Sequence, residues 1–255
     1  MLISSNTLTT RRWLQASWSL IFLGGSAGLA ALIAGPGYRM DWWGLGEGIR
    51  VIAWSGIAAG SGVVLALLCA VFAYRKHGLA MACRFLAGAF ICCLTAAPAA
   101  FYGAKANNLP RIHDISTDLE RPPEFVAVLA LRKDAKNPAR YDPKVAPLQR
   151  AAYPDISSIH LQKSPVAAFR LVNQVAQAMK WDIIATDPNS LRIEATATTL
   201  LFGFKDDVVI RVSPDGANST VDIRSLSRIG VSDIGTNAGR IRDFTKRLEE
   251  LARGG

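Results

Sequence analysis

Cysteine is scarce in this sequence: only four occur in 255 residues, and none lies beyond residue 93. Cys69, Cys83, Cys92 and Cys93 all fall in or beside long apolar runs, and no Cys-x-x-Cys spacing is present. This distribution excludes a disulfide framework and a cysteine-based zinc site. A C-terminal part without cysteine is compatible with an oxidising compartment, because no thiol there can be oxidised.

Basic runs are also missing, although the net charge is +9. Residues 1–104 contain 7 Lys or Arg and 2 Asp or Glu, whereas the remaining residues contain 22 and 18. About half of the positive excess therefore flanks apolar segments, and the rest is spread over a mixed surface. Because no basic cluster or RNA-binding motif is present, nucleic acid is not expected as a partner.

Catalytic signatures are absent from the C-terminal part. It has no Ser-x-x-Lys motif, nucleophile elbow, zinc-binding helix or phosphate loop. His113 is followed by Asp114, but a His-Asp pair without a nucleophile is more often a local hydrogen-bonding arrangement. We therefore assign no catalytic residue and expect no metal and no cofactor.

Three long apolar runs occupy residues 13–34, 49–74 and 79–102. Each is long enough to cross a hydrocarbon core of about 30 Å at about 1.5 Å per residue. Charged residues lie near the ends of the runs, so no ion or proton pathway is expected. Residues 1–104 are predicted to form a three-helix membrane anchor, in which Gly24-x-x-x-Gly28 and Gly56-x-x-x-Gly60 favour close packing of the first two helices.

The basic residues of the anchor predict its orientation. Arg11 and Arg12 precede the first run, and Arg75, Lys76 and Arg84 surround the turn between the second and third runs. Lys and Arg near membrane helices favour the cytoplasmic side. The prediction is a multi-pass protein of the bacterial inner membrane, with a cytoplasmic N-terminus and a periplasmic C-terminal domain.

Residues 105–163 contain seven prolines and little periodicity. This segment is predicted to be either a flexible tether or an extended arm laid over the following domain.

Residues 164–255 have regular patterns. Ser164-Pro165 is a helix start, and apolar residues then recur at helical spacing up to Met179. A strand at 183–186 and alternating patterns at 191–198, 208–212 and 221–224 predict four antiparallel strands, followed by a C-terminal amphipathic helix. The order α-β-β-β-β-α predicts an α+β domain with both helices on the apolar face of a four-stranded sheet.

The second face of this sheet is predicted to be charged. The plain interpretation is a ladder of cross-strand ion pairs on a solvated face. The members of this face are Arg192, Glu194, Arg211, Asp222 and Arg224.

Residues 224–240 are dense in polar side chains and lead into the last helix, whose N-terminal amides favour an anion. One hypothesis is that an anionic ligand, such as a lipid phosphate, binds here. The alternative is that Ser232 or Asp233 caps the helix while the arginines pair with aspartates. The candidate ligand-binding residues are Asp206, Asp207, Arg211, Arg224, Arg228, Asp233, Asn237 and Arg240. Adjacent strand residues point to opposite faces, so Asp206 and Asp207 do not predict a metal site.

The stretch TTLLFGFKDD connects two predicted strands, where polar turn residues are usual. Leu200, Leu201, Phe202 and Phe204 lie there instead. In one interpretation Leu200 and Phe202 fold back to cover the core, and Gly203 permits the bend. In the other, the tip stays exposed and contacts the membrane or a partner.

Several spaced motifs resemble the domain-of-unknown-function family 1499. They are NNLPRIHDISTD, AYPDI, RIEATATTLLFGFKDDVVIRV and VDIRSLSRIGVSDIGTNAGRI, and the resemblance extends from about Asn107 to Leu251. The family implies an envelope-associated or plastid protein, often membrane-anchored, without an established activity. Ser157-Ser158 stands where a proline is expected after AYPDI, which affects only a loop. The resemblance transfers no mechanism.

The resulting prediction is an integral membrane protein that presents an extracytoplasmic binding or scaffold domain. Its expected partners are membrane lipids, with an envelope protein as a second class. The alternative is an envelope hydrolase that uses one of the carboxylates Asp114, Glu194 or Asp206.

Overall fold

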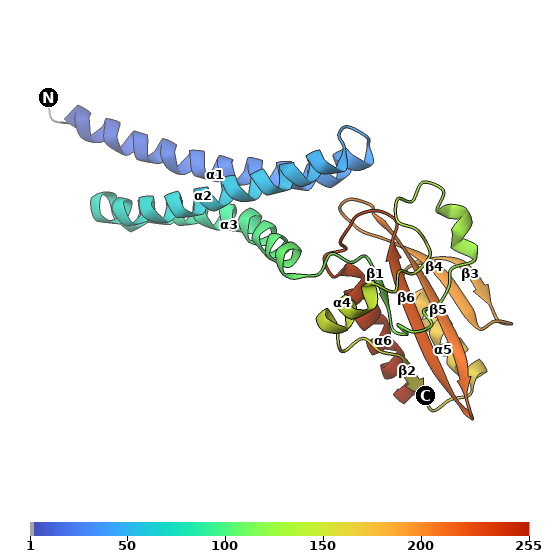
Figure 1. The fold of residues 1–255 in the computed structure, drawn as a ribbon. Coiled ribbons are helices and arrows are strands. Elements are labelled where there is room, and N and C mark those ends of the chain that lie inside the picture. Colours follow the sequence, from blue (N-terminus) through green and yellow to red (C-terminus); the bar gives the residue numbers. More distant parts are fainter. Residues whose placement is uncertain (1–2, 255) are drawn as a thin grey trace. The chain divides into compact units, whose positions relative to one another are not determined.

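The computed structural model describes residues 3–254, and the chain divides into two compact units. The first is Met1–Ala104 and the second is Lys105–Gly255. Figure 1 shows the helices of the first unit in blue to green and most of the sheet of the second in shades of orange.

The first unit consists of the three apolar helices that the sequence predicts. Helix α1 spans Ile3–Arg39, α2 spans Leu45–His77 and α3 spans Leu79–Asn108. Each is long and apolar enough to cross a membrane. All three are longer than the predicted runs, and α1 continues past residue 34, where the first predicted run ends, and through Pro36. A proline inside a helix removes one backbone hydrogen bond and crowds the preceding turn, but helices of membrane-spanning length tolerate it where neighbouring groups satisfy the freed carbonyl.

Small residues bring these helices close together. A Cβ at Gly24 of α1 would lie 2.9 Å from the backbone nitrogen of Cys92 on α3, and one at Gly56 of α2 would lie 2.5 Å from the Cβ of Ala99 on α3. Both glycines therefore face α3, whereas the expected packing of the first two helices against each other is present and uses other residues of α1 and α2. Large apolar side chains such as Phe22, Trp54 and Phe90 are exposed on the outside of the unit, as lipid contact requires.

The second unit contains a six-stranded antiparallel sheet rather than the four-stranded sheet that the sequence predicts. The four expected strands are β3 (Asp182–Asp187), β4 (Arg192–Thr198), β5 (Lys205–Asp215) and β6 (Asn218–Ser227). Two further strands, β1 (Asp114–Ser116) and β2 (Ile159–Leu161), both pair with β6. Each additional strand has three residues, which is too few for an alternating pattern to be visible in the sequence.

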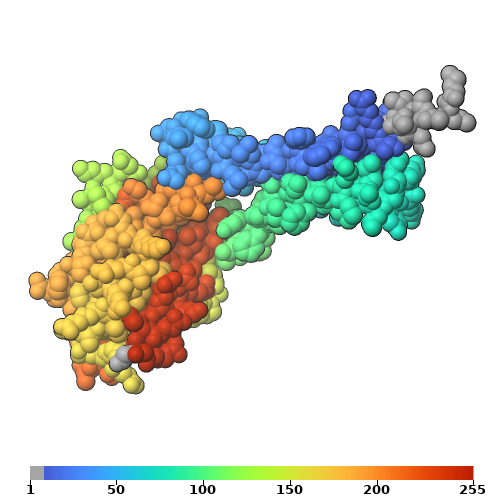
Figure 2. All heavy atoms as spheres, turned by 180° about the vertical axis from the view of Figure 1, so that it is seen from behind, coloured from blue at the N-terminus to red at the C-terminus, as the bar shows by residue number. Residues whose placement is uncertain are grey.

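Two helices cover the apolar face of the sheet. Helix α5 (Pro165–Ala178) and helix α6 (Thr236–Gly254) contact each other and the central strands, and they appear side by side in Figure 2 in yellow and red. Their apolar stripes bury Phe169, Val172, Ile241 and Phe244 against Ile210 and the other inward residues of the strands. The two-helix layer agrees with the periodicity of the sequence.

The other face of the sheet is covered, which corrects the prediction of a solvated charged face. Residues of the proline-rich segment cross it and include the short helix η1 (Ala127–Leu131). Phe125 and Val128 form a small cluster with Val209 and Leu226 of the sheet. Glu194, Asp222 and Arg224 are each at most 3% exposed. We call the part of the proline-rich segment from β1 to the end of the short helix at 145–152 (residues 114–152) the covering segment. It lies up to about 100 residues from these strands in sequence, so alternation within the strands alone cannot reveal it.

Candidate functional site

Arg224 of β6 is the most buried cation of the charged face. Its Nε donates to Oδ1 of Asp114 at 2.9 Å, and its Nη2 donates to Oδ2 at 2.7 Å. The guanidinium also donates to the carbonyl oxygens of Pro123 and Ala139. Asp114 is the first residue of β1, the strand that lies next to β6 in Figure 1. The bidentate pair therefore attaches the edge strand and the covering segment to the sheet.

Two aromatic rings complete the surroundings of Arg224. Its guanidinium carbon lies 5.0 Å from the ring centroid of Phe125 and 5.3 Å from that of Tyr141. Burial, reinforced by the negative charge of Asp114, raises the pKa of Tyr141 to about 12. The phenol therefore stays neutral at physiological pH and adds no charge beside Arg224.

Asp207 of β5 forms a second buried cluster on the same face. Its carboxylate accepts hydrogen bonds from Arg228 Nε at 2.9 Å, Arg228 Nη2 at 2.8 Å and Thr196 Oγ1 at 2.8 Å. Arg132 of the covering segment also donates to it. Asp207 is fully buried, so both arginines are needed to neutralise and solvate its charge.

Asp206 belongs to a third cluster, on the helix face of the sheet. Arg240 of α6 donates to it at 2.7 Å and to Ser225 Oγ at 2.8 Å. Asn237 accepts from Ser225 and donates to Ser227 Oγ and to the carbonyl oxygen of His113. Asp206 and Asp207 thus point to opposite faces, as strand geometry requires, and each has its own arginine partners.

Arg211 and Glu194 of the same face also have polar partners. Arg211 donates to Asp118 at 2.9 Å and to Asp222 at 2.8 Å. Burial alone would raise the pKa of Asp118, but hydrogen bonds from the amides of Arg121 and Glu120 and from Arg211 outweigh it and lower the pKa. The Glu194 carboxylate accepts the amides of Val126 and Val128, each at 3.0 Å, at the start of η1.

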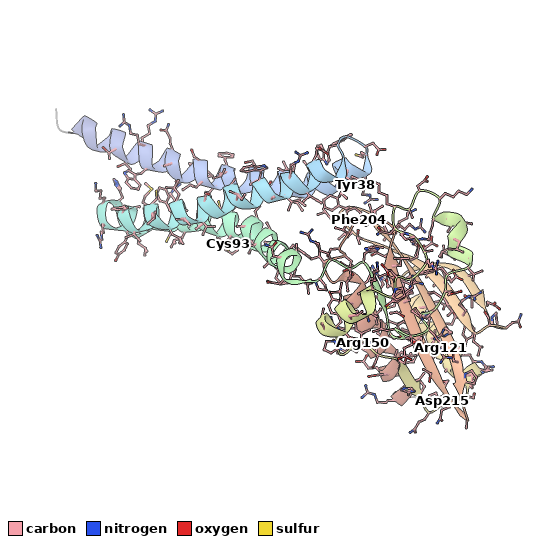
Figure 3. All side chains as sticks on the ribbon, in the orientation of Figure 1. Tyr38, Cys93, Arg121, Arg150, Phe204 and Asp215 are labelled. Atoms are coloured by element: carbon pink, nitrogen blue, oxygen red, sulfur yellow. The ribbon has the colours of Figure 1, made fainter. Side chains whose placement is uncertain are left out.

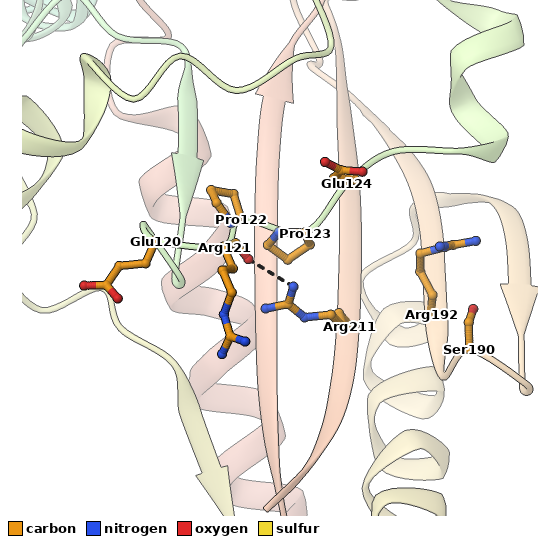
Figure 4. A pocket seen from close by; sticks show the side chains of 8 residues that line it. All are labelled: Glu120, Arg121, Pro122, Pro123, Glu124, Ser190, Arg192 and Arg211. Atoms are coloured by element: carbon orange, nitrogen blue, oxygen red, sulfur yellow. Dashed lines mark hydrogen bonds between the residues drawn. The ribbon is translucent and has the colours of Figure 1, made fainter.

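An open cleft of about 540 Å³ lies above Arg211. Figure 4 shows its lining: Glu120, Arg121, Pro122, Pro123, Glu124, Ser190, Arg192 and Arg211. In this view the side chains of Glu120, Arg121 and Arg192 point in different directions, so they do not converge on one point. Arg211 instead donates to the carbonyl oxygen of Arg121, as the dashed line shows. The cleft is therefore lined by charged side chains, but these side chains are not oriented toward a common ligand position.

Asp233 caps the N-terminal end of α6. Its carboxylate accepts the amide of Gly235 at 3.0 Å and the amide of Asn237 at 2.6 Å. Burial raises the pKa of Asp233, although these two hydrogen bonds oppose the shift. The backbone donors that would have favoured an anionic ligand are therefore used by a residue of the chain itself.

The apolar stretch after β4 forms a tight loop. Its ends are joined by the Thr199 amide, which donates to the Phe204 carbonyl oxygen, and Gly203 has a positive φ of 67°. Leu200 is 95% exposed, so it does not cover the core as one interpretation of the sequence requires. The rings of Phe202 and Phe204 stack with centroids 5.1 Å apart.

Three residues have central roles that the sequence does not predict: Asp114 is expected only as a neighbour of His113 or as a hydrolase carboxylate, and Arg132 and Gln149 have no expected role. Asp114 is the partner of Arg224, Arg132 is a partner of Asp207, and Gln149 binds the outer edge of β1. Gln149 lies on helix α4 (Val145–Ala152), and its side chain accepts the Ser116 amide at 3.0 Å and donates to the Ser116 carbonyl oxygen at 2.6 Å. All three residues belong to the covering segment, and only a tertiary fold relates them to the sheet.

The buried carboxylates of the arrangement are all paired with arginines. Asp114 uses both carboxylate oxygens on Arg224, so it does not form a catalytic pair with His113. Among residues 3–254, no three His, Cys, Asp or Glu side chains gather closely enough to hold a metal ion. The candidate ligand-binding residues are brought together in space, but as partners of one another and of the covering segment.

Comparisons with known proteins agree with the family resemblance. Residues 114–248 match the family described as "Protein of unknown function (DUF1499)". The solved structure of TTHA0849 from Thermus thermophilus is 10% identical, covers 38% of this chain and 86% of its own, and has a TM-score of 0.21. At that TM-score the likeness supports no argument. No curated protein matches the chain.

The family match begins at β1 and ends within α6, and it includes Asp114, Arg132, Gln149, Arg224 and Arg240. It therefore contains the covering segment, the sheet and every buried ion pair described above. With more than half of its residues matched, the chain belongs to the DUF1499 family.

Proposed function

We propose that this protein is a membrane-anchored scaffold or binding protein. Three helices hold an α+β domain on the periplasmic side of a bacterial inner membrane. The observation that carries this proposal is the pairing of the buried carboxylates Asp114, Asp206, Asp207 and Asp222 with arginines of the same domain. A general acid or base needs access to substrate, and these groups are occupied and covered.

Neutralising single carboxylates separates a scaffold from a hydrolase. In a scaffold, Asp206→Asn or Asp207→Asn leaves a buried arginine without its anion and lowers the thermal unfolding midpoint of the full-length protein in detergent. Asp215→Asn, at the exposed end of β5, is the matched control; its one ion-pair contact, with the exposed His160, contributes little, so the midpoint stays unchanged. If both buried variants were as stable as the wild type, the two carboxylates would not stabilise the fold, and a catalytic role in a hydrolase would explain them better.

A labelling experiment tests the orientation. In a variant whose four native cysteines are replaced by serine, Lys105→Cys is exposed to a membrane-impermeant maleimide in intact spheroplasts. The proposed topology predicts labelling without lysis, because the last turn of α3, which contains Lys105, is placed on the periplasmic side. Labelling that requires lysis would reverse the orientation.

A further inference from the structure

One end of the sheet brings together four segments that are distant in sequence. At the end of β6, the Ser227 amide donates to the His113 carbonyl oxygen at 2.9 Å, and the Arg228 amide donates to that of Lys205 at 3.0 Å. The Asn137 amide donates to the Arg228 carbonyl oxygen, also at 3.0 Å. Residues 109–113, 129–137, 199–205 and 228–235 therefore lie side by side. We call their exposed side chains the tether-end surface, because the chain enters the domain here.

Large apolar side chains are exposed on this surface. Leu200 is 95% exposed and Val231 is 70% exposed, and they come from the loops that follow β4 and β6. Leu129 and Leu131 of η1 are about half exposed, and the Leu131 carbonyl oxygen accepts a hydrogen bond from Arg228 at 2.7 Å. Three separate segments thus present leucine or valine at the same end of the domain, which is unusual for a surface in water.

Basic residues surround these apolar side chains. The exposed cations of the four segments are Arg111, Lys133, Lys136 and Lys205. Asp134 is the exposed acidic residue of the same segments. At the nearby start of β3, the exposed Lys180 and Asp182 balance each other. The tether-end surface is therefore apolar and net positive, because Asp206 and Asp207 beside it are already neutralised by arginines.

The chain limits how far this surface can lie from the membrane. Ile112, whose carbonyl oxygen accepts the Asp233 amide at 3.2 Å, follows the end of α3 by only four residues. Four extended residues span at most about 14 Å. Since α3 is a membrane-spanning candidate, this end of the domain lies within about 14 Å of the end of a helix that enters the bilayer.

We infer that the tether-end surface rests on the anionic lipid surface of the bilayer that holds the three helices. This inference rests on the proposed membrane anchoring of the domain. Leu200 and Val231 enter the boundary between headgroups and acyl chains, while Lys133, Lys136 and Lys205 meet lipid phosphates. The occupant is the bilayer rather than a partner protein because the covalent attachment places lipid beside this end.

Accessibility of a spin label measures the contact. The full-length chain without native cysteines is labelled through Leu200→Cys and reconstituted in nanodiscs that contain phosphatidylglycerol. Collisions with a water-soluble nickel chelate are expected to fall several-fold relative to the same protein in detergent. Asp215→Cys is the matched control; Figure 3 labels Phe204 and Asp215 at opposite ends of β5, and the label at 215 stays equally accessible in both environments.

A charge variant tests whether the lysines of the tether-end surface contribute to the lipid contact. Lys133→Glu with Lys136→Glu is expected to reduce the ratio of protected to accessible label at 200 by about fivefold or more for each lysine removed. The matched variant, Lys246→Glu with Arg247→Glu on α6, leaves that ratio unchanged. Native hydrogen exchange of β5 and β6 in both variants shows that the domain remains folded.

The outcomes of the spin-label experiment distinguish a lipid contact from a protein contact and from a failure of the proposed anchoring. A label at 200 that stays as accessible as the label at 215 in nanodiscs overturns the lipid contact, although the anchoring still holds. Protection in native membranes but not in purified nanodiscs also overturns it and assigns the surface to a protein partner. Failure of the wild type to enter nanodiscs would instead contradict the proposed anchoring itself.

Discussion

Arg224 and Asp114 form a bidentate ion pair although they are 110 residues apart in the chain, and the side chains are only 2% and 6% exposed. The pair joins the edge strand β1 to the central strand β6. Because it is enclosed by Phe125 and Tyr141, water cannot replace either partner. The charged face of the sheet is therefore part of the interior of the domain.

Gln149 is predicted to hold β1 in place. Gln149→Ala removes the side-chain amide that pairs with both backbone groups of Ser116 and leaves them unsatisfied, at a cost of about 1–3 kcal/mol each at most. Hydrogen exchange measured by mass spectrometry should show faster exchange in the peptide that contains Ser116. Gln174→Ala, on the exposed side of α5, is the control and leaves exchange unchanged. Equal protection in both variants would contradict the assigned role.

The anchor offers a pair of neighbouring glycines with opposite environments. A Cβ at Gly24 would lie 2.9 Å from the nitrogen of Cys92, whereas one at Gly25 would meet nothing within 4 Å. Gly24→Leu should force α1 and α3 apart and lower the thermal unfolding midpoint in detergent, while Gly25→Leu should not. Similar midpoints for the two variants would show that these helices do not pack as described.

Stability is predicted to fall in acid, in part because of Asp118. Its pKa is lowered in the folded state below the ordinary value of 3.8, so the folded protein binds fewer protons than the unfolded chain in that range. The free energy of unfolding therefore decreases as the pH falls below about 4. Asp118→Asn should reduce stability at neutral pH and flatten this acid limb in pH-dependent unfolding curves. Parallel curves for variant and wild type would argue against the contribution.

The sequence predicts those parts of the fold whose pattern is local. Ser164 accepts the Ala167 amide at 3.4 Å and begins α5, and the alternation of Val208, Ile210 and Val212 marks the inward side of β5. These elements follow from residue spacing alone because their apolar stripes repeat several times. The three membrane-length helices are equally visible, since their apolar runs exceed 20 residues.

The covering segment could not be predicted in the same way. Strands β1 and β2 have three residues each, and the ion pairs of Asp114 and Arg132 connect positions at least 75 residues apart. The pattern of the charged strands predicts opposite charges near each other, but not whether water or protein covers them. For this reason the candidate site was expected at the surface, whereas Asp207 and Arg224 are buried.

The double-mutant cycle of Arg224 and Asp114 tests the internal role of the charged face most directly. Arg224→Met leaves the buried carboxylate unpaired, so unfolding of the full-length protein should become easier by about 3–5 kcal/mol, and Asp114→Asn combined with it should recover part of the loss. Arg242→Met breaks the exposed pair with Asp155 and should cost at most about 1 kcal/mol. A loss for Arg224→Met no larger than that for Arg242→Met would contradict the account.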